Sequence, residues 1–520
     1  MRSEHSSISS LGLDPRAVDF TSGVTVASIQ EVLRTAIKQG LDWFTGVRPH
    51  PRQLVLDDEK QLHPLAGQSG KVAKFPASPS QEGLWYMNQL QPESSAYNLP
   101  VGLRFTGHLD CHALERSLQA IVNRHDALRT RFDLQETELS QVVTREFIVT
   151  LPLTDFSDVP EGRRYQETWE MAINETRLAF DLSRIPLFRL RLFRLQPNDH
   201  VLICVMHHII SDGWSLGVFV SELLTLYGAF STGTESPLEP LPNQYGDYAM
   251  WQREALTSET FRHQLAYWMR QLQGSPPVTK LPVDSDFPFR ETTESACQFA
   301  PISKELVRDL KDLSTKQDAT LFMIALAAFK AVLRRYTGQD DIPIGIPTAG
   351  RDRVETEALI GYFVKILVLR TNLSGNPRFC DYLTHVREVT LEALCNCDVP
   401  FVKVVQELNP IRSVNRHANP VFQVMFAVIN AAVKSQQVGE LSTSPYVVRT
   451  GNSPVDLTLN LIEAADENWM VQFEYNTGLF SHERIAKLLK DYVSVLGAVA
   501  LQPHLRISDL PILTRRETPS

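Results

Sequence analysis

The stretch VLICVMHHIISDGWSLGVFVSELLTLYGAF, from Val201 to Phe230, contains the signals that decide the fold. It begins with an apolar run that ends at Met206 and is typical of a buried strand. It ends with apolar residues at the spacing of an amphipathic helix. A second strand pattern, FRLRLFRL up to Leu195, precedes it across the turn QPNDH and predicts a hairpin. The polar residues 207–213 are therefore expected at the junction between a strand and a helix.

Strands and helices alternate on both sides of this stretch. PVGLRFTG predicts a strand and is followed by a helix after Asp110, and the later strand patterns include DIPIGIPTAG and FVKILVLRTNL. The 520 residues exceed the roughly 250–300 at which one core stops growing. The prediction is a mixed α/β chain with two lobes, residues 71–252 and 253–515, after a small N-terminal extension, residues 1–70.

Composition argues weakly against several classes of partner. The chain has 51 basic and 60 acidic residues, a net charge of -9, and the two signs are interleaved, which argues against nucleic acid and anionic membranes. The apolar run TLFMIALAAF is about half of the roughly 20 residues that a membrane span needs. The six cysteines are scattered, without the spacing of a zinc site or a disulfide framework. We expect a soluble, cytoplasmic protein without a metal.

The segment HHIISDGWSLG, residues 207–217, has competing chemical interpretations. G-x-S-x-G would make Ser215 a hydrolase nucleophile, but the strand pattern ends near Met206, so this serine is expected in the first helical turn rather than in a nucleophile elbow. A metal site is disfavoured because His207 and His208 are adjacent and point to opposite faces of an extended chain.

The third interpretation is a general base. A neutral histidine can accept a proton near pH 7, Asp212 can brace the loop through an arginine, and Gly213 lets a substrate approach the backbone closely. A buried histidine with a purely structural role is the alternative.

The same residues resemble a known family. MHHIISDGWS is similar to the H-H-x-x-x-D-G signature of nonribosomal peptide synthetase condensation domains, and other family motifs follow the same order over residues 75–515. These motifs are SPSQEGLWYMNQL, RHDALRTRF, YGDYAMWQ, GIPTAGR, IGYFVKILVLR, DVPFVKVVQEL and NPVFQVMF. An epimerisation domain keeps the signature, but NPVFQVMF is typical of condensation domains.

The resemblance implies a fold and a set of site residues. The fold would be a V-shaped pseudo-dimer of chloramphenicol-acetyltransferase-like lobes with a central tunnel. His208 would be the catalytic histidine, supported by His207. Asp212 would form a structural salt bridge, for which Arg351 is our candidate partner, and the Gly213 amide would face the developing oxyanion. The candidates for the tunnel wall or substrate contact are Trp214, Ser215 and Lys365.

The resemblance also implies an activity. A donor acyl or peptidyl thioester and an aminoacyl acceptor, each on the phosphopantetheine arm of a peptidyl carrier protein, would be joined through an amide. No cofactor would be bound to the domain itself. We expect a monomer whose carriers arrive in trans, and residues 1–70 are a candidate docking element or degenerate carrier. The alternatives are an ester-forming enzyme with a hydroxyl acceptor and a non-catalytic platform that recruits carriers.

Three departures from the family pattern bear on specificity. Gly83 stands where an arginine is usual, Lys365-Ile366 where Asn-Thr is usual, and Asn396 where a histidine is usual. Lys365 in the tunnel wall would favour an acidic donor or acceptor, unless its ammonium is simply solvated.

Overall fold

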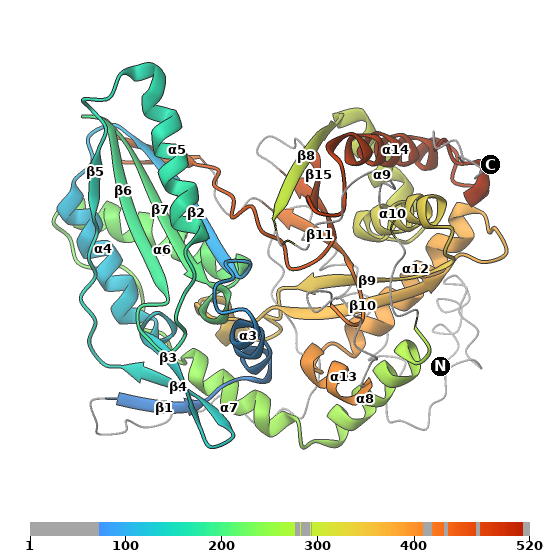
Figure 1. Ribbon diagram of the computed structural model, residues 1–520, viewed down its shortest axis with the longest axis horizontal. Helices are drawn as coiled ribbons and strands as arrows, with labels where there is room; N and C mark the ends of the chain where they lie inside the picture. Colours follow the sequence, from blue (N-terminus) through green and yellow to red (C-terminus); the bar gives the residue numbers. More distant parts are fainter. Residues whose placement is uncertain are drawn as a thin grey trace, which may run out of the picture. The chain divides into compact units, whose positions relative to one another are not determined.

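The computed structural model describes residues 72–275, 281, 292, 294–408, 419–430, 435–463 and 469–512. Within them, two six-stranded sheets carry most of the structure, and each is covered by helices (Figure 1). The expected mixed α/β class with two sheet-based lobes is confirmed. The predicted extension, residues 1–70, and its helix and hairpin patterns lie outside the described residues.

The first sheet places the motif. Its strand order is β12-β13-β2-β7-β6-β5. The central strand β7 is buried along its whole length, because helices cover both faces, and it pairs antiparallel with β6 as the predicted hairpin. The strands are β2 (Asn98–Thr106), β5 (Leu153–Asp155), β6 (Phe188–Gln196), β7 (Asp199–His207), β12 (Gln436–Val438) and β13 (Leu441–Pro445).

Three helices pack on this sheet: α4 (Cys111–Arg124), α5 (Glu161–Arg177) and α6 (Gly213–Ser231). Helix α6 follows the motif and packs against α4, while α5 contacts β2, β6 and β7. Among the described residues, α6 is the one helix long and apolar enough to cross a membrane. Half of its apolar window is buried inside the domain, which is also true of core helices.

The second sheet has the order β10-β9-β11-β14-β15-β8. Helices α10 and α14 pack against each other, and α10 also contacts α12 and α9. The strands are β8 (Ser295–Ile302), β9 (Asp341–Thr348), β10 (Lys365–Asn372), β11 (Val424–Asn430), β14 (Leu457–Glu463) and β15 (Trp469–Asn476). The helices are α9 (Lys304–Lys316), α10 (Leu321–Thr337), α12 (Phe379–Cys395) and α14 (His482–Leu501).

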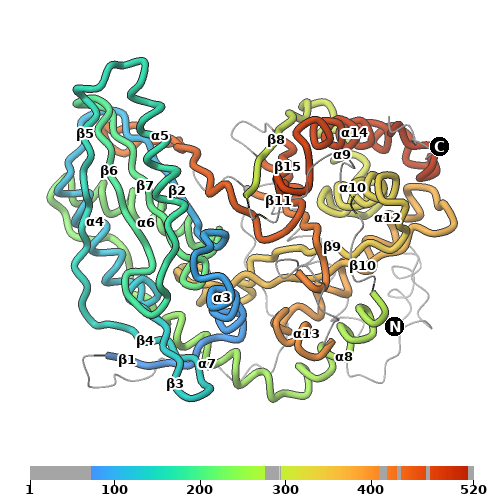
Figure 2. The backbone as a smooth tube through the Cα atoms, in the orientation of Figure 1, coloured from blue at the N-terminus to red at the C-terminus, as the bar shows by residue number. Residues whose placement is uncertain are grey.

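A strand from the second half of the sequence joins the sheet of the first half. Strand β13 comes from the second half but pairs antiparallel with β2 of the first sheet, from Ser442 opposite Thr106 to Pro445 opposite Leu103. Figure 2 shows this orange-red part of the tube passing from the second sheet to the first. The proposed boundary between residues 252 and 253 lies inside α7 (Tyr245–Ala255), a helix that packs on β1.

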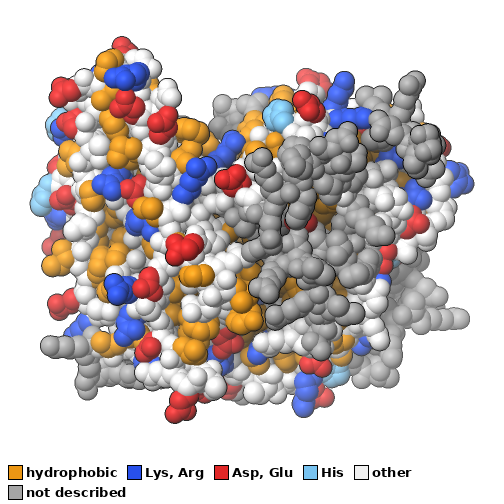
Figure 3. Space-filling view, in the orientation of Figure 1, with side chains coloured by type: hydrophobic (Ala, Val, Ile, Leu, Met, Phe, Trp, Pro, Cys, Tyr) orange, Lys and Arg blue, Asp and Glu red, His pale blue; other side chains and the backbone are white. Residues whose placement is uncertain are grey.

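A small three-stranded sheet, β1-β4-β3, and short helices complete the described fold. The strands are β1 (Val72–Pro76), β3 (Thr130–Gln135) and β4 (Glu138–Thr144). The helices are α3 (Pro79–Leu90), α8 (Glu259–Leu272), α11 (Val354–Glu357), α13 (Phe401–Leu408), η3 (Asp126–Arg129), η4 (His208–Ile210) and η6 (Ile507–Asp509). On the face in Figure 3, acidic and basic side chains are interspersed, as their order in the sequence suggests.

Candidate functional site

The motif is held rigidly at both ends. Strand β7 ends at His207, the single turn η4 follows, and α6 begins at Gly213. Asp212 is the N-cap of α6, and its Oδ1 accepts the Ser215 N–H at 2.7 Å. Aspartate is a favoured N-cap because its carboxylate satisfies one of the free amides of the first turn. The predicted junction between strand and helix is therefore a short loop fixed between a central strand and a capped helix.

His207 is buried, with 2% of its surface exposed. Its Nδ1 accepts the Ile209 N–H at 3.1 Å, and its ring lies edge-on to Phe180 with the centroids 6.0 Å apart. Burial first, and then the nearby His208 and Arg189, lower its pKa to about 3. His207 is therefore neutral at pH 7 and supports the turn that carries the next residue.

His208 has the geometry of a neutral base. Its Nδ1 lies 2.8 Å from the carbonyl oxygen of Ser211, and a carbonyl can only accept, so Nδ1 carries the proton. In this tautomer the lone pair is on Nε2. The main-chain N–H of His208 donates to Tyr97 O at 2.8 Å. Burial lowers the pKa of His208, while the Ser211 carbonyl and Asp212 oppose this shift. The residue is half-buried, and the Nδ1 bond leaves the lone pair of Nε2 as its basic position.

Asp212 has a structural role rather than a catalytic one. It has no exposed surface. Besides capping α6, its Oδ1 forms an ion pair with Arg351 Nη2 at 3.2 Å, and its Oδ2 accepts the Phe363 N–H at 3.0 Å. Both oxygens are occupied by groups from the second half of the chain or from α6. Asp212 thus holds the motif against the second half and does not touch reacting atoms.

Arg351 is the partner that the sequence suggested for Asp212. Its Nη1 donates to the carbonyl oxygens of Thr356 and Leu359, the latter at 2.8 Å. Its guanidinium carbon lies 4.1 Å from the centroid of the Phe363 ring. Burial lowers the pKa of Arg351 and the Asp212 carboxylate opposes the shift. The ion pair is enclosed, with 2% and 0% of the two side chains exposed.

Ser215 is not positioned as a nucleophile. Its Oγ donates to Gly361 O at 2.9 Å and accepts from Gly361 N at 3.1 Å and from Arg351 Nη2 at 2.8 Å. A hydroxyl has one proton and two lone pairs, so these three bonds saturate it. The residue is also fully buried. This geometry excludes the hydrolase interpretation, and it corrects the expectation that Ser215 contacts substrate, because the hydroxyl joins the two halves instead.

Gly213 and Trp214 lie in the first turn of α6. No acceptor among the described residues binds their main-chain N–H groups, and a helix N-terminus favours negative charge. A Cβ added at Gly213 would meet nothing within 4 Å, so the space beside it is open. Trp214 is 48% exposed, and its Nε1 donates to Glu357 O at 2.9 Å. The turn can therefore offer amides to an oxyanion.

Two residues near the motif were not assigned a role from the sequence. His125, buried at 1% exposure, donates from Nε2 to Glu222 at 2.8 Å and accepts the Ile360 N–H on Nδ1 at 3.3 Å. The motif RHDALRTRF contains His125, so a signal was present. Tyr362 lies against His208, with ring centroids 4.9 Å apart, and its only sequence signal was its place in IGYFVKILVLR.

The contacts of Lys365 do not support the expectation that this lysine favours an acidic substrate. Its ammonium donates to Asp398 Oδ1 at 2.9 Å and to Asp352. Burial alone would lower the pKa of Lys365, but these carboxylates and Cys397 hold it well above its usual value. Its positive charge is thus already neutralised within the protein. The ammonium is therefore not freely solvated, and we expect it not to select an acidic donor or acceptor.

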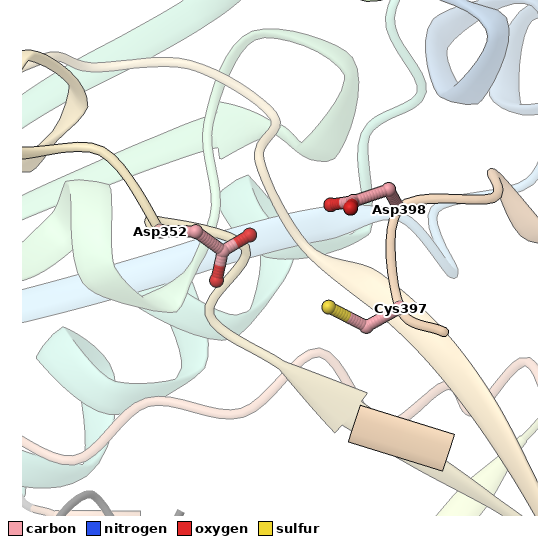
Figure 4. Close-up of side chains that lie close together, drawn as sticks. All are labelled: Asp352, Cys397 and Asp398. Carbon is pink, nitrogen blue, oxygen red and sulfur yellow. The ribbon is translucent and has the colours of Figure 1, made fainter. Parts of the chain in front are cut away.

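The same cluster contains three potential metal ligands. Figure 4 shows Asp352, Cys397 and Asp398 converging, with ligand atoms within 4.8 Å of one another. Burial raises the pKa of the Cys397 thiol, which lies 3.9 Å from Lys365 Nζ. Lys365 donates to both carboxylates, so their charge is already compensated within the protein. We therefore keep the prediction that this cluster works without a metal ion.

The other two departures lie outside the motif. A Cβ at Gly83 in α3 would lie 3.6 Å from Val402 of α13, an ordinary van der Waals contact, so the glycine faces α13 but this contact does not require it. Asn396 follows α12, and its carbonyl oxygen accepts the Trp268 Nε1 hydrogen at 2.7 Å. The described contacts of both residues are structural.

Comparison with known proteins identifies the family. The model of the condensation domain matches residues 71–520. The chain is 39% identical over 501 residues to a protein of the linear gramicidin synthase of Brevibacillus parabrevis, covering 95% of this chain and 10% of that protein. It is 35% identical to phosphinothricin tripeptide synthetase of Streptomyces viridochromogenes, covering 85% of this chain and 40% of that protein. The chain therefore spans well under half the length of these relatives.

Solved structures agree with this assignment. The X-domain from teicoplanin biosynthesis, determined in complex with OxyB, aligns with a TM-score of 0.77 and 27% identity. The alignment covers 88% of this chain and 99% of that one. The likeness therefore extends over both sheets and not only over the motif.

Proposed function

The chain belongs to the condensation-domain family of nonribosomal peptide synthetases, and we propose that it joins a carrier-bound acyl or peptidyl thioester to a carrier-bound aminoacyl acceptor. The observation that carries this proposal is the tautomer of His208. Its Nδ1 is bound to the Ser211 carbonyl at 2.8 Å, which leaves Nε2 as a neutral base at the N-terminus of α6.

The proposed reaction is the aminolysis of a thioester. The acceptor amine attacks the donor carbonyl, a C–N bond forms and the C–S bond breaks. The amine proton passes to Nε2 of His208 and then to the departing thiolate, which leaves as the thiol of the donor arm. General-base assistance of this kind typically contributes about 10²- to 10⁴-fold. The free amides of Gly213 and Trp214 are suited to stabilise the oxyanion of the tetrahedral intermediate.

The other site residues act through His208 and its loop. His207 supports the turn, and Asp212 with Arg351 fixes the loop against the second half of the chain. Ser215 has no part in an acyl-enzyme, because its hydroxyl is saturated. Trp214 is exposed at the N-terminus of α6 and remains our candidate for substrate contact.

The partners of this reaction follow from the family. We propose that the donor and acceptor are thioesters on the phosphopantetheine arms of two peptidyl carrier proteins, and that the domain itself binds no cofactor. Residues 1–70 remain a candidate docking element for one carrier. A monomeric state, carriers supplied in trans and a cytoplasmic location also stay predictions. The neutral base would serve a hydroxyl acceptor in the same way, so ester formation is the chemical variant of this proposal.

A second candidate is a recruiting platform without catalysis. The likeness to the X-domain, which was solved in complex with OxyB, favours it, because this fold there binds a second protein. The two candidates differ in what His208 must do. A platform does not need a neutral base at this position, whereas the enzyme does.

The test is intact-protein mass spectrometry of two loaded carriers mixed with the protein. Donor carriers bearing aminoacyl groups and acceptor carriers bearing amines or hydroxyl acids would be tried as a panel. With the parent protein, we expect the mass of the donor group to be transferred to the acceptor carrier. Transfer should be lost in His208→Ala and retained in Ser215→Ala. If no pair in the panel reacts while the carriers still bind, the platform replaces the enzyme.

A further inference from the structure

One loop of the second half is inserted into the first. Ile360 belongs to the hydrophobic core around β7 and α6. Glu357 O binds Trp214, Gly361 binds Ser215 through both its N–H and its carbonyl, and the Phe363 N–H binds Asp212. The loop Glu357–Phe363 is therefore docked by its backbone on the N-cap and first turn of α6.

Tyr362 lies in the middle of this docked loop. Its carbonyl oxygen accepts the hydroxyl hydrogen of Tyr245 at 2.7 Å, and the Tyr245 hydroxyl also bonds Ser78 Oγ at 3.0 Å. A Cβ added at Gly361 would lie 2.1 Å from Tyr245 Cδ2, so a residue with a side chain cannot occupy that position without displacing Tyr245. The backbone of Tyr362 is thus fixed from two sides.

The side chain of Tyr362 contacts the proposed base. Its ring and the His208 imidazole have centroids 4.9 Å apart and planes inclined at 72°, which is the edge-to-face arrangement favoured by aromatic pairs. The first half holds His208 through its Nδ1 bond to Ser211 and its main-chain bond to Tyr97. Tyr362 is a contact that the second half adds.

We propose that Tyr362 is a positioning residue for His208, so that the base is complete only when the Glu357–Phe363 loop is docked on α6. The ring fixes the plane of the imidazole and excludes water from one of its faces, and it couples the docking of the two halves to catalysis. The part that concerns transfer rests on the proposed function, whereas the contact itself does not.

Burial lowers the pKa of His208, and two neighbours, the Ser211 carbonyl and Asp212, oppose this shift. The adjacent His207 is neutral at pH 7, and burial raises the pKa of Tyr97, whose main-chain oxygen binds the His208 N–H, to about 12. Burial also raises the pKa of Tyr362, so both phenols stay neutral. Loss of the Tyr362 ring would therefore act on His208 through hydration and position and not through a change of charge.

The experiment measures His208 directly. Diethyl pyrocarbonate acylates only neutral imidazoles, and peptide mass spectrometry separates His208 from the other histidines. Tyr362→Leu keeps the apolar bulk but removes the aromatic ring, and Tyr362→Phe keeps the ring. We expect His208 in Tyr362→Leu to be modified about three- to tenfold faster at pH 7, with a pKa nearer the ordinary value, and Tyr362→Phe to match the parent protein.

Two outcomes overturn the proposal: His208 reactivity in Tyr362→Leu equal to the parent, or Tyr362→Phe as altered as Tyr362→Leu. Tyr86→Leu is the matched control, since this tyrosine is 46% exposed on α3. Its His208 reactivity should equal that of the parent protein.

A second measurement separates this proposal from the proposed function. The transfer of an aminoacyl group from a loaded carrier to an aminoacyl N-acetylcysteamine thioester should slow about tenfold or more in kcat in Tyr362→Leu, with little change in KM, because misplacement of a base acts on the chemical step. Tyr362→Phe should restore the rate. If the parent protein transfers nothing, the proposed function fails, and the reactivity of His208 alone decides whether Tyr362 controls it.

Discussion

Ser215 and Gly361 exchange two hydrogen bonds across the two halves of the chain, with Ser215 Oγ donating to Gly361 O at 2.9 Å and accepting from Gly361 N at 3.1 Å. The serine that completes G-x-S-x-G therefore joins two segments separated by 146 residues in sequence. Arg351 binds the same hydroxyl and also pairs with Asp212. The contact between the halves and the loop that carries His208 thus form one network of hydrogen bonds.

Ser215→Ala should cost stability and not chemistry. It leaves the polar groups of Gly361 and one N–H of Arg351 without their partner in a buried site, which should lower the free energy of unfolding by about 2–3 kcal/mol. Urea denaturation measures this loss. Ser221→Ala on the exposed face of the same helix is the control, with an expected change within about 0.5 kcal/mol. Loss of transfer with unchanged stability would instead assign Ser215 to catalysis.

His207 should make the protein sensitive to acid. Its folded pKa is about 3, below the ordinary histidine value of 6.5, so the unfolded chain takes up a proton that the folded protein cannot. Stability is therefore complete above pH 6.5 and falls as the pH is lowered toward 3, by up to about 1.4 kcal/mol per pH unit.

The measurement is the free energy of unfolding at pH 7 and pH 5. His207→Asn should show a smaller difference between the two pH values than the parent protein, although it is less stable at pH 7. His263→Asn, at an exposed position on α8, should keep the parent difference. Equal pH dependence in all three proteins would contradict the assignment to His207.

The transfer rate should fall at acidic pH, with a midpoint below the ordinary histidine pKa of 6.5. Burial lowers the pKa of His208, and the base works in its neutral form, so activity is retained above the folded pKa and lost as the pH falls through it. Single-turnover rates measured between pH 5 and 8 should show the acidic limb of the pH–rate profile below pH 6.5. A limb above that value would mean that another group is the base.

The residues that the sequence identified well are those whose neighbours in space are also neighbours in the chain. The apolar run of β7 and the amphipathic α6 are encoded by local patterns on either side of the motif, and a helix follows Asp110 as its apolar spacing predicted. The family motifs then indicated Arg351, which no local pattern connects with Asp212.

Contacts between distant segments left no such signal. Strands β5 and β12 have three residues each, too few for a periodic pattern, and β13 leaves its own half to pair with β2. Lys365 read as a free charge because its partner Asp398 lies 33 residues away. The contact of Tyr362 with His208 depends on how the whole loop is docked, and therefore only the structure reveals it.

Asp212 and Arg351 should be strongly coupled in stability. Either Asp212→Ala or Arg351→Met leaves one buried charge without its partner, which typically costs about 3–5 kcal/mol, whereas the double variant removes both charges. The double variant should therefore be more stable than the sum of the single changes predicts. The exposed pair Arg163 and Glu167, 3.9 Å apart, is the control. The coupling energy of this control pair should be below about 0.5 kcal/mol. An equally small coupling energy for Asp212 and Arg351 would contradict the proposal that their ion pair holds the motif loop against the second half of the chain.

Lys365 should matter for stability and not for the choice of substrate. Lys365→Met removes hydrogen bonds to Asp398 and Asp352, which should lower the free energy of unfolding at pH 7 by about 2 kcal/mol. The lysine also holds the pKa of Asp398 below its usual value, so this stabilisation is complete at pH 7 and is lost only as the pH falls through the folded pKa of Asp398. Adding Asp398→Asn should recover part of the loss, because two carboxylates then no longer face each other without a cation. Lys311→Met, at an exposed position, is the control.

The choice of substrate should not depend on Lys365. Because its ammonium is already neutralised, the ratio of transfer rates to aspartyl-loaded and asparaginyl-loaded acceptor carriers should be the same in Lys365→Met and in the parent protein. A fall in the aspartyl preference of Lys365→Met would show that the ammonium reaches the substrate after all.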